Sequence, residues 1–172
     1  KRLMTLIDDI IKLSFLDEDN NDSVDYKDVD VYKLCESVNN DLALVAKNCN
    51  VNLSLKGDHF ITNSSSRLLY MVIYNLVDNA IKYNRPGGHV DVSVSNEGII
   101  KVKDNGIGIP EESIDRIFER FYRVDKSHSK EVGGTGLGLS IVKHAVMTLG
   151  GDISVKSKLN KGSEFTIVLP KL

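Results

Sequence analysis

The chain has 172 residues, of which 41% are hydrophobic and 27% are charged, and its formal net charge at pH 7 is −2. That length suits one ordinary domain with an appendage, and the hydrophobic fraction is sufficient for a core. The slightly negative charge gives no electrostatic case for nucleic-acid binding, and the apolar runs are too short to span a membrane.

Residues 1–16 carry the pattern of a helix that packs against another helix. Its apolar residues recur at spacings of three and four, at Leu3, Leu6, Ile10 and Leu13. So short a helix is marginal alone, so we expect a partner helix outside this chain or in a second copy. The alternative is that the helix folds back on the domain that follows. Because the chain begins with Lys1 and not Met, we expect it to be part of a longer protein.

The rest of the chain divides into an acidic linker at 17–23 and one domain at 24–172. In chain order we expect a strand at 24–31, a helix with the apolar stripe Leu34, Val38, Leu42, Val45 and Cys49, a strand at 51–55, a helix at 67–83, a hairpin at 90–95 and 99–103, a loop-rich stretch at 104–135, a helix at 137–149, and strands at 153–156 and 165–169. This interleaving predicts a two-layer α/β sandwich, a mixed sheet of about five strands covered by about three helices.

The two cysteines, Cys35 and Cys49, have no CxxC spacing. Both are predicted to lie on the apolar side of one helix, which favours buried, reduced thiols. Reduced thiols fit a reducing compartment.

One stripe of the helix at 67–83 turns polar. Asn75, Asn79 and Lys82 lie one above another at helical spacing, beside apolar faces. Polar groups beside a core need partners, and a phosphate–metal site would supply them. Asparagine oxygens suit Mg²⁺, and Lys82 would add positive charge for phosphates. The alternative is an ordinary solvated helix edge.

Residues 104–110, DNGIGIP, directly follow a predicted strand. Glycines at alternate positions allow a backbone to approach a flat ligand closely. The carboxylate of Asp104 can accept a hydrogen bond from an exocyclic amine such as that of adenine. A tight turn with ordinary Asn-Gly chemistry is the alternative.

Residues 133–140, GGTGLGLS, lead into a predicted helix. Glycines at a helix N-terminus expose amides to an anion, and the helix dipole adds to this, so phosphate binding is favoured over a flexible hinge. The pattern matches neither the P-loop nor the dinucleotide-binding fingerprint.

The segment at 117–126 lies between the two glycine-rich stretches and combines aromatic with charged residues. We interpret it as a lid that Phe118 and Phe121 dock and from which Arg123 reaches phosphates. We expect residues 118–134 to be mobile without nucleotide. The alternative is a surface helix with two buried rings.

These motifs occur in an order that resembles one family. Asn75-x-x-x-Asn79, Asp104-x-Gly106-x-Gly108, Phe118-x-x-Phe121 and Gly134-x-Gly136-x-Gly138 resemble the N box, first glycine box, F box and second glycine box of histidine kinases. These kinases belong to a superfamily with DNA gyrase, the Hsp90 chaperones and MutL. The resemblance covers about 24–172 and implies a Bergerat-type ATP-binding fold. The opening helix resembles the end of the second helix of a dimerisation and phosphoacceptor domain.

The resemblance also implies a role for each matching residue. Asn79 would bind Mg²⁺, assisted by Asn75. The phosphates would be held by Lys82, by Arg123 and by the amides around Gly134, Gly136 and Leu137. Asp104 would bind the adenine amino group, Tyr83 would flank the base, Gly106 and Gly108 would shape the base pocket, and Thr166 would assist the adenine contact through water. Ile109, Phe118, Thr135 and Gly138 complete the predicted ATP-binding set.

The family's phosphoacceptor, a His followed by an acidic residue, is missing from this sequence. Each of the four histidines lacks the acidic neighbour: His59, His89, His128 and His144. The resemblance therefore implies an ATP-dependent protein histidine kinase whose reacting histidine lies elsewhere in a longer, homodimeric protein. Its partners would be its own phosphoacceptor domain and a response regulator, and we expect a cytoplasmic location.

Three other functions remain open at this stage. A gyrase-like or MutL-like ATPase clamp would need a catalytic carboxylate near Asn79, where Asp78 is the only candidate. An anti-sigma-type Ser/Thr kinase would share the fold, although the opening helix argues against it. A degenerate, non-catalytic scaffold would lack intact boxes.

Overall fold

The structure is a computed structural model that describes residue 7 and residues 25–124 and 134–170. Apart from residue 7, the predicted bundle helix at 1–16 and the linker at 17–23 lie outside the described residues, as does the predicted lid between 125 and 133. In the described part of the chain, no helix combines the length and hydrophobicity that a membrane crossing requires.

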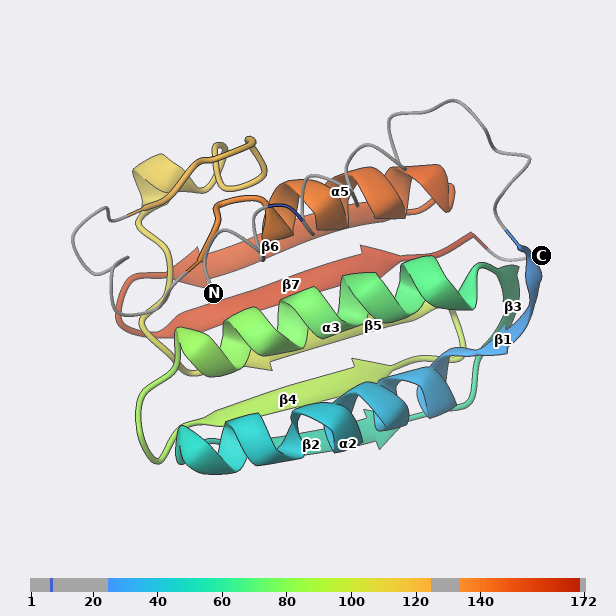
Figure 1. The fold of residues 1–172 in the computed structure, drawn as a ribbon, viewed down its shortest axis with the longest axis horizontal. Helices are drawn as coiled ribbons and strands as arrows, with labels where there is room; N and C mark the ends of the chain where they lie inside the picture. The colour runs from blue at the N-terminus through green and yellow to red at the C-terminus, as the bar shows by residue number, and fades with distance from the viewer. Residues whose placement is uncertain (1–6, 8–24, 125–133, 171–172) are drawn as a thin grey trace.

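The described chain forms two layers. The elements are β1 (Lys27–Asp30), α2 (Val31–Asn48), β2 (Asn52–Gly57), β3 (Ile61–Ser64), α3 (Ser66–Lys82), β4 (His89–Val94), β5 (Ile99–Asp104), the 3₁₀ helix η2 (Glu111–Ser113), α5 (Gly138–Thr148), β6 (Asp152–Lys158) and β7 (Gly162–Val168). Five strands form a sheet in the order β2-β4-β5-β7-β6, while β1 and β3 pair separately. Helices α2, α3 and α5 cover one face of the large sheet (Figure 1). The predicted α/β sandwich is confirmed.

The large sheet is mixed, as predicted. Strands β2 and β4 are parallel, and the pairs β4–β5, β5–β7 and β7–β6 are antiparallel. Residues that face the helices are buried, whereas their neighbours along each strand are mostly charged or polar and lie on the uncovered face. In β5, for example, Ile100 and Val102 are buried and Lys101 and Lys103 are exposed. This alternation has the period of two expected of a sheet covered on one side.

Helix α3 is the centre of the core and packs against both α2 and α5. Its N-cap is Ser65, whose Oγ accepts a hydrogen bond from Leu68 N at 3.4 Å. Side chains such as Leu69 and Ile73 are fully buried. Burial of each contributes about 2 kcal/mol of transfer free energy. The burial continues to Ile81 near the C-terminal end of α3, and that end carries the polar stripe.

The structure corrects several local predictions. The strand expected at 24–31 is shorter, because α2 already begins at Val31, and strand β3 was not predicted. The buried face of α2 is Val31, Cys35, Val38, Leu42 and Ala46, which is rotated from the predicted stripe. Cys35 is buried as expected, but Cys49 is exposed because it caps the C-terminus of α2 beyond the last turn against the sheet.

Candidate functional site

Segments that are distant in the sequence meet at one end of the sandwich. In Figure 1 the C-terminal end of α3 and the end of β5 lie on the left, and α5 begins above the C-terminal half of α3. The helices approach closely there, because a Cβ added at Gly138 would lie 3.3 Å from Asn75 Oδ1 and 3.9 Å from Asn79 Nδ2. The N box and the second glycine box are therefore neighbours, as their predicted functions require.

The polar stripe of α3 has an internal arrangement. Asn75 Nδ2 donates to Met71 O at 2.8 Å, so its Oδ1 is the atom nearest to Gly138. Lys82 Nζ forms an ion pair with Asp78 Oδ2 at 2.5 Å, four residues earlier on the helix. Asp78 thus holds the Lys82 side chain at the end of the polar stripe, and the sequence analysis did not predict this ion pair.

A metal ion at this end would be held mainly by neutral oxygen ligands and by ligands from outside the chain, because the described part of the chain places no cluster of carboxylates there. The described residues contain no group of three His, Cys, Asp or Glu side chains placed to hold a metal ion. The amide oxygens of Asn75 and Asn79 are the available side-chain ligands, and Mg²⁺ accepts one or two protein oxygens together with phosphate and water. The donor set therefore fits a Mg²⁺ ion that arrives with phosphates.

Asp104 ends β5, and its side chain is partly buried. Burial raises the pKa of its carboxyl above the ordinary value, although hydrogen bonds from the backbone of Gly106 and Ser163 and the charge of His89 act in the opposite direction. Asp104 Oδ1 accepts from Gly106 N at 2.8 Å. A half-buried carboxylate with these fixed donors has capacity left for one more donor, such as a ligand amine.

The glycines after Asp104 are required by the chain's own backbone. A Cβ at Gly106 would lie 2.3 Å from Tyr83 O, and one at Gly108, where φ is +69°, would lie 2.1 Å from Lys158 O. Ile107 N also donates to Tyr83 O at 3.1 Å. The two glycines therefore let the loop after Asp104 pack closely against the end of α3 and the β6–β7 hairpin, with Tyr83 beside it and 40% exposed.

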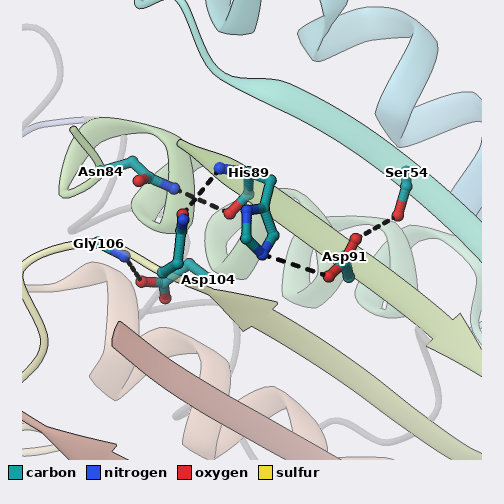
Figure 2. A network of polar contacts seen from close by, with 7 residues as sticks. Ser54, Asn84, His89, Asp91, Asp104 and Gly106 are labelled. Atoms are coloured by element: carbon teal, nitrogen blue, oxygen red, sulfur yellow. Dashed lines mark hydrogen bonds and ion pairs between the residues drawn. The ribbon is translucent and has the colours of Figure 1, made fainter. Parts of the chain in front are cut away.

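Polar contacts tie the loop after α3 to the strands beside Asp104. Asn84 Nδ2 donates to His89 O at 3.0 Å, and His89 N donates to Asn105 Oδ1 at 2.8 Å. Figure 2 shows how this network continues from His89 to Asp91 on β4 and to Ser54 on the edge strand β2. Sequence reasoning missed Asn84 and Asn105, because their role depends on the pairing of β4 with β5.

The second glycine box forms the entry to α5. Leu137 is the N-cap of α5, and its apolar side chain cannot accept a hydrogen bond. The amides of the first turn of α5 therefore donate no hydrogen bond to an N-cap side chain. Thr135 Oγ1 accepts from Leu137 N at 3.3 Å. A Cβ at Gly134 would lie 3.4 Å from Tyr83 Oη and 3.7 Å from Arg123 Nη2. Arg123 and Tyr83 therefore both lie close to Gly134 of the second glycine box.

Residues 117–124 are docked differently from the prediction. Ile117 is buried, and the ring of Phe118 packs edge-on against Phe165, with centroids 6.4 Å apart. Phe121, however, is 61% exposed, so the prediction that its ring docks the segment is wrong. Its backbone makes the contact instead: Phe121 N donates to Gly136 O at 2.9 Å, with φ of +64° at Phe121.

Thr166 does not join the site. It pairs with Lys101 and Ser154 on the uncovered face of the sheet, because its strand neighbours Phe165 and Ile167 fill the core. The predicted adenine contact of Thr166 is therefore wrong.

Ser163 lies beside Asp104 instead. It is 8% exposed, and its backbone donates to the Asp104 carboxyl. The signal for it in the sequence was a small hydroxyl residue directly after Gly162, at the start of the strand that pairs with β5. The remaining predicted residue, Ile109, follows Gly108 and is half-buried against the core.

Comparisons with known proteins agree with this geometry. The family model described as histidine kinase-, DNA gyrase B- and HSP90-like ATPase matches residues 64–172. The chain belongs to this family.

Within the family, the chain is a sensor histidine kinase catalytic domain. It is 45% identical to sensor histidine kinase WalK of Bacillus subtilis in an alignment 125 residues long, which covers 64% of this chain and 20% of that protein. It is 36% identical to sensor histidine kinase RppB of Synechocystis over 176 residues, covering 99% of this chain and 38% of that protein. The solved structure of the Acinetobacter baumannii histidine kinase AdeS superposes with a TM-score of 0.78 and 26% identity over 97% of this chain and 77% of that one. The chain thus spans well under half the length of these two curated relatives.

Proposed function

We propose that this chain binds Mg-ATP at the end of the sandwich where α3, β5 and α5 meet. The observation that carries the proposal is the approach of Gly138, at the start of α5, to Asn75 and Asn79 on α3. Amides of a helix N-terminus beside two neutral asparagine side chains suit a magnesium–phosphate group. Asp104, on the adjacent strand, then has the position and the acceptor capacity for the adenine amino group.

Each residue has a defined task in this proposal. Asn79, assisted by Asn75, would hold the Mg²⁺ ion, which neutralises phosphate charge when bound. The amides at 134–138 would bind phosphate oxygens, with Arg123 beside Gly134 adding charge. Alignment and charge neutralisation are the main contributions a protein makes to phosphoryl transfer. No nucleophile is assigned to this chain.

We infer that the γ-phosphoryl group is transferred to a histidine outside this chain. The four histidines of the sequence lack the acidic neighbour of a phosphoacceptor, and relatives of the chain are longer sensor kinases. The longer protein would be a cytoplasmic or membrane-anchored homodimer that passes the phosphoryl group to a response regulator. Incubation of this chain alone with labelled ATP should therefore leave the chain unlabelled, whereas stable self-labelling would contradict the proposal.

A clamp-type ATPase is the second candidate, and the position of Asp78 argues against it. A hydrolytic clamp needs a carboxylate that is free to activate water, but Asp78 is paired with Lys82 at 2.5 Å. ATP hydrolysis by the chain should thus be slow, and Asp78→Asn should leave that rate unchanged. A fall in hydrolysis on this substitution would favour the clamp.

Binding of a non-hydrolysable ATP analogue, measured calorimetrically with and without Mg²⁺, tests the metal assignment. In the wild type, Mg²⁺ should strengthen binding about 10-fold or more, because the ion links phosphate oxygens to Asn79. Asn79→Ala should remove most of this gain. Asn40→Ala, at an exposed helical asparagine of α2, is the matched control and should keep it. An unchanged magnesium effect in Asn79→Ala would overturn the assignment.

A further inference from the structure

Ser157 occupies the junction of three segments beside the proposed base pocket. It lies on β6, and its Oγ accepts from Ile109 N, at the end of the first glycine box, at 2.8 Å. The same oxygen lies 2.9 Å from Gly162 O and 2.9 Å from Ser163 Oγ, both at the start of β7. One hydroxyl therefore links the glycine box to two consecutive residues of the β6–β7 hairpin.

The protons of this cluster can be assigned. A serine hydroxyl has one donor and two acceptor positions. Since Ile109 N–H donates to Ser157 Oγ and Gly162 O can only accept, the Ser157 proton goes to Gly162 O. Ser163 must then donate its hydroxyl proton to Ser157. In this arrangement all three contacts are hydrogen bonds, and the hydrogen-bonding capacity of Ser157 is fully used.

The partners of Ser157 adjoin Asp104 on two sides. On one side, Gly162 is so close that an added Cβ would lie 2.0 Å from Asp104 O, and the backbone of Ser163 donates to the Asp104 carboxyl. On the other side, Ile109 ends the short segment that begins at Asp104 and places Gly106 N on its carboxylate. A shift at Ser157 would therefore move both donors that orient this carboxylate.

We propose that Ser157 is a positioning residue for nucleobase recognition. It acts through Ser163 and Ile109 to fix the Asp104 carboxylate, and so sets the preference for adenine over a purine without the 6-amino group. The inference rests on the proposed ATP site and assigns a specificity role to a residue that would not touch the nucleotide. A side chain that merely supported the fold would affect all nucleotides alike.

The test compares the affinities of the chain for ATP and for inosine triphosphate, which has a carbonyl in place of the amino group. Wild type should favour ATP because Asp104 accepts from the amine. In Ser157→Ala the ATP affinity should fall about 10-fold while the affinity for inosine triphosphate changes little, which lowers the preference for ATP. Ser157→Thr, which keeps the hydroxyl, should retain the wild-type preference.

Ser154→Ala is the matched control. Ser154 lies on the same strand, three residues earlier, and is exposed on the uncovered face of the sheet. It should keep the wild-type preference. A wild-type preference in Ser157→Ala, or an equal loss for both nucleotides with a lowered melting temperature, would overturn the inference while leaving the ATP site intact. A wild-type chain that does not bind ATP would overturn the proposed function itself.

Discussion

Asp104, the carboxylate that we propose binds adenine, affects the stability of the domain even without nucleotide. Burial raises the pKa of Asp104, so in the window between its ordinary and raised pKa values the folded state binds more protons than the unfolded state. The ionised side chain therefore costs stability at neutral pH, and that cost disappears as the pH falls through the raised pKa. In the proposed site the carboxylate would bind the adenine amine, and that contact would offset this cost when nucleotide is bound.

Replacing Asp104 by Asn should therefore stabilise the nucleotide-free domain. We expect a rise in melting temperature on the order of a few degrees at neutral pH, because the buried charge is removed while an acceptor oxygen stays. The difference between variant and wild type should shrink as the pH is lowered. Thermal unfolding at several pH values measures this, and a lower melting temperature in the variant at neutral pH would contradict the account.

The two cysteines should react differently although both were predicted to be buried. Burial raises the pKa of Cys35 to about 12, while Cys49 is exposed at the end of α2. Thiolates are the reactive form, so a thiol reagent near pH 8 should modify one cysteine of the native chain and both after unfolding. Cys49→Ser should leave no rapidly reacting thiol. Fast native modification of Cys35 would show that α2 packs differently.

At the scale of elements, sequence periodicity predicted most helices and strands. It failed where a residue's structure depends on the strand with which its segment pairs. The helix at 67–83 and the hairpin at 90–103 were predicted from apolar spacing and turn residues, and the structure confirms both. Strand β3 was missed because its partner β1 is distant in sequence. Thr166 was misplaced for a similar reason, because the face a strand residue occupies depends on register, which sequence alone does not fix.

The contact between the first glycine box and the β6–β7 hairpin should be intolerant of any side chain at Gly108. Gly87 and Gly108 both have positive φ, of +80° and +69°, but an added Cβ at Gly87 meets nothing within 4 Å whereas one at Gly108 lies 2.1 Å from Lys158 O. Gly87→Ala should cost about 1 kcal/mol in unfolding free energy from backbone strain alone. Gly108→Ala should cost clearly more, about 3 kcal/mol or above. If urea unfolding showed the same loss of unfolding free energy for both variants, the predicted clash at Gly108 would be refuted.

At the scale of the whole molecule, the fold places the site by geometry that no single motif contains. Helices α3 and α5 cover the same face of the sheet, and the end of one meets the start of the other beside the end of β5. The order of the motifs predicted the family, which the comparisons confirm, whereas the roles of the site residues stay predictions. The role of Ser163 and the exposure of Phe121 depend on packing between segments, so only the structure reveals them. The ion pair of Lys82 with Asp78 is different, because it is local to α3 and its i, i+4 spacing can be read in the sequence.

The most direct test of the account is the affinity of this chain for Mg-ATP, measured with a non-hydrolysable analogue by titration calorimetry. The account predicts saturable binding of one nucleotide per chain, weakened about 10-fold or more in Asp104→Asn because the amine loses a charged acceptor. The affinity of the wild type should also fall at mildly acidic pH, as Asp104 gains a proton at a higher pH than an ordinary aspartate. No measurable binding, or equal affinity in wild type and Asp104→Asn, would contradict it.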